Sequence, residues 1–231
     1  ATAAAAVRAV GGEITHELGI IDAVAARLSP DQVERLRATP GLELHADAPV
    51  QSASGAWSSI TVPRVGADRL HQEGVYGAPV TIAVLDTGSW YSYVPIAKDI
   101  YGQPRIRAEY NAITNKIEHV KDESGHGTHV ASIALSSRLD DQGLYLGIAP
   151  NARLVVVKAF GENGGGRYSD VIRGIDWIVS KKATYNIRVR NGSFSVPARS
   201  HYWDGPLDQA VMAAGRAGIV VVASAGNAGP N

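Results

Sequence analysis

Apolar residues follow two different patterns along the chain, and the change between them divides it into two regions. Residues 1–50 contain two strand-like apolar stretches, at residues 13–18 and 20–28, and one short helical pattern. From about residue 63, short fully apolar runs alternate with segments whose apolar residues recur every three or four positions. These patterns are typical of buried strands and amphipathic helices. We therefore expect a small α+β domain at 1–50, a linker at 51–62 and a larger domain at 63–231.

The helix predicted in the first region has clear start signals. Ser29 suits the N-cap, Pro30 suits the first turn, and Gln32 completes a capping box. A closing strand is predicted at residues 42–45, after a Pro-Gly pair that ends the helix. Residues 48–62 are rich in Ser, Ala and Gly, which favours a linker.

The larger region alternates predicted strands and helices. Strands are expected at 80–85, 153–157, 187–189 and 219–223, helices at 128–136, 169–180 and 207–217, and an irregular stretch at 89–121. Strands that alternate with helices form parallel crossovers, so the sheet is covered on both faces. The predicted fold class is α/β, with a doubly wound and mostly parallel sheet. Functional groups of such sheets collect beyond the carboxyl ends of the strands.

Composition narrows the function classes. Hydrophobic residues make up 45% of the chain and charged residues 19%, which is typical of a folded globular protein. The formal net charge is zero and no basic run occurs, which argues against a nucleic-acid partner. Cysteine is absent, so disulfides and thiolate metal sites are excluded. The apolar runs are too short to span a bilayer, and no membrane partner is expected.

Two short motifs carry the clearest chemistry. Asp86 follows an apolar run and precedes Thr87-Gly88, which places its carboxylate at the end of a buried strand. His126 lies between two glycines at the start of a helix, where backbone or substrate can approach closely. A carboxylate so held can orient an imidazole by accepting its Nδ1 proton, as in a Ser-His-Asp triad. Taken alone, Asp86 is an ordinary turn residue and His126 an ordinary helix start; their order favours a catalytic pair.

These motifs and several others resemble the subtilisin-like serine peptidase family. The matching segments are Val84-Leu85-Asp86-Thr87-Gly88, Ser124-Gly125-His126-Gly127-Thr128-His129-Val130-Ala131, Gly147-Ile148-Ala149-Pro150, Val157-Lys158-Ala159-Phe160, and residues 164–169 and 221–229. The similarity covers nearly all of residues 63–231. Residues 1–50 resemble the family's inhibitory propeptide, with its first strand missing or truncated. The resemblance implies a subtilisin-like fold and the chain order Asp, His, Ser.

The resemblance also implies roles for individual residues. Asp86 would orient the base, His126 would act as general base and acid, and Asn227 would donate an amide to the oxyanion hole. An extended peptide substrate would pair with two flanking segments, as in strand addition. Those segments are Gly164, Gly165 and Gly166 on one side, and Ser193, Phe194 and Ser195 on the other.

The chain departs from the family pattern at several positions. Ser195 stands where the family usually has glycine, and Arg190 and Gly192 replace more usual apolar residues. Three aromatic residues within 90–93 are expected to form either a binding surface or a packed insertion. No Gly-Thr-Ser segment occurs, so we expect a fragment whose nucleophilic serine lies beyond Asn231.

No cofactor is expected, and no metal ligand is predicted. His126 and His129, beside Asp122, lack the His-Glu-x-x-His spacing, so His129 is expected to pack within its helix. Asp140 and Asp141 lie in a loop where relatives often bind calcium. The alternating oxygen ligands of a dedicated calcium loop are absent, which favours solvated carboxylates; structural calcium stays possible without a clear motif.

The sequence therefore predicts a secreted serine endopeptidase whose partners are polypeptide substrates and its own propeptide. The alternative is a catalytically inactive scaffold that binds extended peptides without cutting them. Asp86 and His126 are expected within hydrogen-bond reach of each other, with Asn227 opening onto the same cleft. Residues 48–56 are expected to run toward that cleft.

Overall fold

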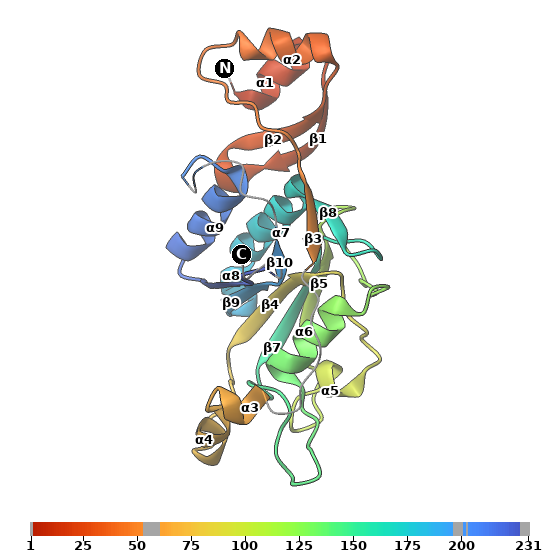
Figure 1. Ribbon diagram of the computed structural model, residues 1–231, viewed down its shortest axis with the longest axis vertical. Coiled ribbons are helices and arrows are strands. Elements are labelled where there is room, and N and C mark those ends of the chain that lie inside the picture. Colours follow the sequence, from red (N-terminus) through yellow and green to blue (C-terminus); the bar gives the residue numbers. More distant parts are fainter. Residues whose placement is uncertain (1, 53–60, 196–200, 202, 227–231) are drawn as a thin grey trace.

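The computed structural model describes residues 2–52, 61–195, 201 and 203–226. Figure 1 shows an elongated molecule in which a small N-terminal unit sits at one end of a larger sheet-and-helix part. The unit contains α1 (Ala3–Ala9), β1 (Glu13–Leu18), the 3-10 helix η1 (Gly19–Ile21), β2 (Ala23–Arg27) and α2 (Pro30–Arg37). Strands β1 and β2 pair antiparallel.

The N-terminal unit has a small core of its own. Ala6, Val7 and Leu36 are buried between its helices and its two strands. The predicted capping box of α2 is confirmed: Ser29 Oγ accepts from the Gln32 amide, and Gln32 Oε1 accepts from the Ser29 amide. Helix α1 escaped prediction because a run of alanines has high helix propensity but no polar and apolar pattern. The strand predicted at residues 42–45 is wrong, since this stretch forms no regular element.

The central sheet has six strands in the order β11-β9-β4-β7-β5-β6. They are β4 (Thr81–Asp86), β5 (Ile106–Asn111), β6 (Lys116–Ile117), β7 (Arg153–Lys158), β9 (Ile187–Gly192) and β11 (Val220–Ala223). All neighbouring pairs are parallel except β5 with β6. The predicted doubly wound, mostly parallel α/β fold is therefore confirmed.

Helices cover both faces of the sheet. Ala83 and Leu85 of β4 pack on the side of α7 (Tyr168–Ser180) and α9 (Pro206–Arg216). Val84 points to the other side, where it packs with α6 (His126–Leu135). The remaining short helices are α3 (Thr61–Arg64), α4 (Ala67–Gln72), α5 (Val94–Ala97) and α8 (Lys182–Tyr185).

The prediction of an irregular stretch at residues 89–121 is wrong, because these residues contain α5, β5 and β6. Strand β5 joins the sheet beside β7, yet its sequence mixes charged and apolar residues and only Tyr110 is fully buried. An apolar-run criterion misses such a strand near the edge of a sheet.

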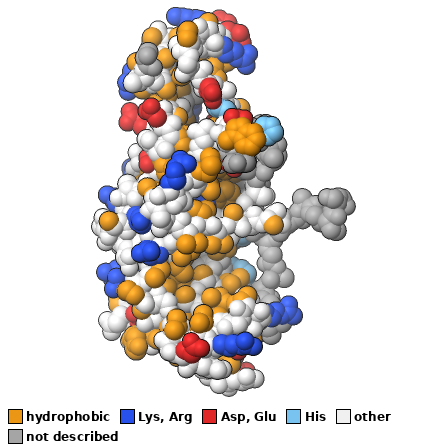
Figure 2. All heavy atoms as spheres, turned by 90° about the vertical axis from the view of Figure 1, so that its left-hand side faces the viewer, with side chains coloured by type: hydrophobic (Ala, Val, Ile, Leu, Met, Phe, Trp, Pro, Cys, Tyr) orange, Lys and Arg blue, Asp and Glu red, His pale blue; other side chains and the backbone are white. Residues whose placement is uncertain are grey.

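One face of the edge strand β11 carries exposed apolar side chains. Figure 2 views the side on which α9 lies in Figure 1 and shows hydrophobic side chains over much of the larger part. Val221 of the edge strand β11 packs in the core that α7 and α9 cover. Val220 and Val222 point to the opposite face and are 62% and 45% exposed. No described residue covers these two side chains fully.

A second, three-stranded sheet joins the N-terminal unit to the larger part. Its order is β10-β3-β8, all antiparallel, with β3 (Pro49–Ser52) between β8 (Gly165–Arg167) and β10 (Phe194–Ser195). Figure 1 shows β3 descending from the unit into this position. The linker predicted from residue 48 onward is therefore wrong in part: residues 49–52 form a strand, and helix α3 begins at Thr61. Residues 53–60 lie outside the described part.

Candidate active site

Asp86 and His126 meet at the carboxyl end of the sheet. Asp86 is the last residue of β4 and is 1% exposed, while His126 is the first residue of α6. Asp86 Oδ1 lies 2.6 Å from His126 Nδ1 and also accepts the Thr87 amide at 2.8 Å. The expected contact is therefore confirmed. Because a carboxylate only accepts, Nδ1 carries the proton, and the tautomer leaves Nε2 as the basic nitrogen.

Glycines in both motifs allow these segments to approach. Gly88 has φ +122°, and a Cβ there would lie 2.6 Å from the carbonyl oxygen of Lys121. A Cβ on Gly127 would lie 2.4 Å from the carbonyl oxygen of Gly88. A larger residue at Gly88 would push the strand end away from the segment before α6, and one at Gly127 would push α6 away from the strand end.

Asp122 joins the segments that carry Asp86 and His126, a role that was not predicted from the sequence. Its buried carboxylate accepts from Thr87 Oγ1 at 2.7 Å, the Gly125 amide at 2.8 Å, and the Thr128 amide and hydroxyl at 2.8 and 2.6 Å. Burial alone would raise the pKa of Asp122, but the hydrogen bonds from Thr128 and Thr87 outweigh it and lower that pKa. The available signal was an acidic residue just before a helix start, which favours capping.

The metal alternatives gain no support from the described residues. Within residues 2–52, 61–195, 201 and 203–226, no group of three or more His, Cys, Asp or Glu side chains could hold a metal ion. Asp140 instead accepts the amides of Gln142 and Leu144, both at 2.9 Å, and so shapes its own loop.

Strand β3 lies between the two segments that sequence analysis assigned to substrate binding. Gly165 and Gly166 of β8 pair with it on one side, and Phe194 and Ser195 of β10 on the other. Gly164 lies in the turn before β8, with φ +71°. Ser193, just before β10, accepts a hydrogen bond on its Oγ from Asn191 Nδ2 at 2.8 Å.

The floor beneath β3 is apolar. Val50 is 1% exposed and belongs to the main core, together with Phe160. The ring centroids of Phe160 and Phe194 are 5.3 Å apart. A Cβ on Gly166 would lie 2.5 Å from the carbonyl oxygen of Ala159 and 2.8 Å from the Phe160 ring, so only glycine fits at this position of β8. Strand β3 of this chain thus lies between the two segments that the sequence analysis assigned to an extended substrate. Asn227 lies outside the described residues.

Arg190 and Gly192 form a matched pair beside Phe194. Arg190 is 1% exposed, and its guanidinium carbon Cζ lies 5.3 Å from the Phe194 ring centroid. A Cβ on Gly192 would lie 2.8 Å from Arg190 Nη1, so glycine makes room for the arginine. Nε and Nη2 of Arg190 have no hydrogen-bond partner in the described part of the chain. Burial lowers the pKa of Arg190 to about 10.

Charged contacts hold the N-terminal unit to α7. Asp47 accepts the Ser169 amide at 3.0 Å and the Ser169 hydroxyl at 2.7 Å, at a helix start whose own N-cap residue makes no side-chain bond. His16 Nε2 lies 2.9 Å from Asp170 Oδ1, and Arg173 donates to the Thr15 carbonyl at 3.0 Å. The cap of α7 and the hydrogen-bond partners in its N-terminal half therefore come from segments that are distant in sequence.

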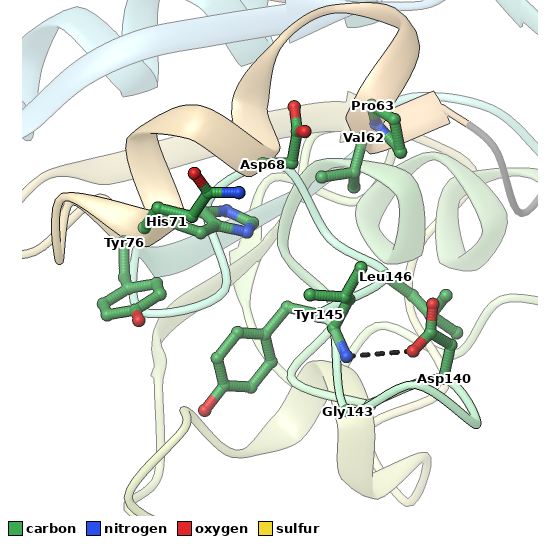
Figure 3. Close-up of a pocket in the computed structure, with 11 residues that line it drawn as sticks. Val62, Pro63, Asp68, His71, Tyr76, Asp140, Gly143, Tyr145 and Leu146 are labelled. Atoms are coloured by element: carbon green, nitrogen blue, oxygen red, sulfur yellow. Dashed lines mark hydrogen bonds between the residues drawn. The ribbon is translucent and has the colours of Figure 1, made fainter.

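A separate cavity of about 240 Å³ lies between α4 and the 140–146 loop. Figure 3 shows His71, Tyr76 and Tyr145 on one side of it and Asp140 on the other. His71 Nε2 is hydrogen-bonded to the Ile148 carbonyl at 2.9 Å. Neither Asp86 nor His126 lines this cavity, so it is distinct from the candidate active site.

Sequence comparison identifies the family. A model of the subtilase family, peptidase S8, matches residues 77–231. The chain belongs to the subtilase family. It is 32% identical to an alkaline protease of Alkalihalobacillus alcalophilus over 220 residues, which cover 94% of this chain and 52% of that protein. It is 30% identical to subtilisin E of Bacillus subtilis strain 168, over 95% of this chain and 53% of that protein.

A third relative, subtilisin DY of Bacillus licheniformis, is 37% identical over 73% of this chain and 54% of its own length. The chain thus spans about half the length of the curated relatives that it matches. The matched family region begins just before β4 and includes Asp86 and His126. Among the described helices of this subtilase, none is long and apolar enough to cross a membrane.

Proposed function

We propose that this subtilase chain carries two members of the catalytic triad of a serine endopeptidase. The observation that carries the proposal is the 2.6 Å hydrogen bond between Asp86 and His126. Asp86 fixes the tautomer and orientation of the imidazole. His126 takes the proton of the nucleophile as it attacks the peptide carbonyl, and returns a proton to the leaving amine. Asn227 donates its side-chain amide to the oxyanion.

The nucleophile in this proposal is a serine that the sequence does not contain, supplied by a segment that follows Asn231. The exposed Val220 and Val222 support it, because a further packed segment would cover this apolar face of β11. The acyl-enzyme forms on that serine, and water then hydrolyses this ester, which releases the acyl product and regenerates the serine. On its own, the chain is inactive.

We also propose that the N-terminal unit is the inhibitory propeptide of the same protease. Strand β3 lies where a substrate would add as a strand, paired on both sides with backbone. Residues 53–60, of which six are Ser, Ala or Gly, suit cleavage between the two parts. The domain limits 1–50, 51–62 and 63–231 belong to this proposal.

Polypeptides are the proposed substrates, and secretion is the proposed location. The relatives are named alkaline proteases and subtilisins, which supports proteolysis as the activity. The chemistry assigned to Asp86, His126 and Asn227 needs no cofactor, and no calcium motif supports a structural ion.

The alternative is a scaffold that binds extended peptides without cutting them. The three-stranded sheet is one observation in favour of such a scaffold. The pairing of β3 with β8 and β10 uses backbone alone and needs no serine. The two functions share the groove and differ only in the reaction of His126.

Processing of the complete polypeptide separates the two functions. We would express the chain together with the segment that carries the serine, as the unmodified protein, as His126→Ala and as His119→Ala. His119 is a half-exposed histidine outside the proposed triad, and serves as the matched control. The unmodified protein and the control should yield two pieces and His126→Ala one. Cleavage of His126→Ala, or no cleavage of any form, would contradict the proteolytic mechanism and favour the scaffold.

Probe labelling tests the inactivity of the chain alone. A serine-reactive fluorophosphonate should leave the 231-residue chain unlabelled by mass spectrometry. Stoichiometric labelling of any serine in it would show that the nucleophile is already present.

A further inference from the structure

The buried ammonium of Lys158 has no part in the proposed reaction. Lys158 ends β7 and pairs in register with Asp86 on the neighbouring strand β4. Only 8% of the residue is exposed. Burying a charged amine is unfavourable unless its donors find acceptors. All three do: Nζ donates to the Thr87 carbonyl, to the Lys121 carbonyl at 3.1 Å and to Glu123 Oε2 at 2.8 Å.

These acceptors belong to the two segments that carry the proposed catalytic pair. Thr87 directly follows Asp86, whereas Lys121 and Glu123 lie in the segment that leads into His126. The Lys121 carbonyl is also the group that approaches Gly88 too closely for a Cβ. The ammonium therefore sits where the two segments are nearest, and binds both.

Lys158 and Asp122 connect these segments in complementary ways. Asp122 accepts from the Thr87 hydroxyl and from the first turn of α6. Lys158 donates to the carbonyl oxygens of Thr87 and Lys121. Asp122 cannot satisfy these oxygens, because a carboxylate only accepts hydrogen bonds. The side-chain hydrogen bond from Lys158 is the main cause that lowers the pKa of Glu123, as expected for an ion pair. One anion and one cation thus fix the relative position of the strand end and the helix.

We propose that Lys158 is a positioning residue: its ammonium clamps the turn after Asp86 to the segment before His126 and so maintains the hydrogen bond between them. The proposal rests on the proposed function of that pair. The Lys158 ammonium donates to the backbone carbonyls of Thr87 and Lys121 and acts through them.

The Nδ1 proton of His126, observed by NMR in the ¹⁵N-labelled chain, tests the proposal directly. Lys158→Met should make this proton exchange with water roughly tenfold faster, because the local opening that exposes it loses charge-assisted hydrogen bonds. The matched control is Lys121→Met, which removes a neighbouring exposed ammonium but keeps the Lys121 carbonyl. It should leave the exchange rate within about twofold of the unmodified chain.

A second variant covers the case in which Lys158→Met does not fold, as judged by circular dichroism. Glu123→Ala removes the outer acceptor, whose side chain is 37% exposed, and should also speed exchange, by a smaller factor. The proposal is overturned if folded Lys158→Met exchanges as slowly as Lys121→Met, or if Lys158→Met is unfolded and Glu123→Ala exchanges at the unmodified rate. Asp86→Asn separates the two levels of inference: if it leaves the protected Nδ1 proton unchanged, the proposed function itself fails.

Discussion

Replacing Arg190 by methionine should stabilise this chain, although it removes a large buried side chain. Burial lowers the pKa of Arg190 from its ordinary value to about 10, so the guanidinium remains charged at pH 7 and its burial reduces the free energy of unfolding. At about 1.4 kcal/mol for each pKa unit, that cost is roughly 3 kcal/mol. The contact with the Phe194 ring returns about 0.5–2 kcal/mol. Methionine keeps an unbranched stem and carries no charge, so we expect a net gain of about 1–3 kcal/mol.

Urea unfolding at pH 7, followed by circular dichroism, measures this gain. The control is Arg188→Met on the same strand, because Arg188 is exposed and its replacement should change stability by less than about 0.5 kcal/mol. A loss of stability in Arg190→Met that exceeds the change in the control would refute the reasoning. It would mean that the guanidinium is satisfied by a partner in the folded chain, and that its burial is not a net cost.

Three further predictions follow from the site and from the contact between the two parts. Asp47→Ala should cost about 1 kcal/mol in urea unfolding, the usual value of a lost helix cap, whereas Asp31→Ala in α2 serves as an exposed acidic control. Val50→Asp should speed amide exchange of β8 and β10 in mass spectrometry, because an unpaired carboxylate cannot stay in an apolar floor; unchanged exchange would show that β3 is not held by this residue. The folded pKa of Asp122 lies below its ordinary 3.8, so its ionised form stabilises the fold above about pH 4, and that stability is lost as the pH falls through the folded pKa. Acid unfolding of Asp122→Asn should therefore show a shallower pH dependence than the unmodified chain, and equal slopes would contradict it.

Strong local patterns predicted the elements that place the proposed catalytic pair. The apolar run before Asp86 is β4, and the glycines around His126 begin α6. Strands alternating with helices were enough to predict a parallel sheet, since parallel neighbours require crossover connections. The contact between Asp86 and His126 then followed from motif order and the family resemblance. Their roles in catalysis remain a proposal.

The elements that sequence analysis missed lack a local pattern. Residues 49–52 contain proline, valine, glutamine and serine, which read as a linker, yet they form β3. That strand exists because β8 and β10 offer unpaired backbone on either side, and both lie more than a hundred residues away in the chain. Strand β5 is similar: its place beside β7, rather than its own apolar content, makes it a strand.

The sequence by itself determined the α/β fold class, the order of Asp86 and His126, and the glycines that let their segments meet. The spacing of apolar residues and the local composition predict such features, because these features arise from burial and backbone freedom within a few residues. Only the tertiary structure decided that β3 pairs between β8 and β10, that Asp122 and Lys158 join the two segments, and that Arg190 is buried beside Phe194. Each of these depends on hydrogen bonds, charges and space supplied by residues distant in sequence, whose free energies appear only when the chain is folded.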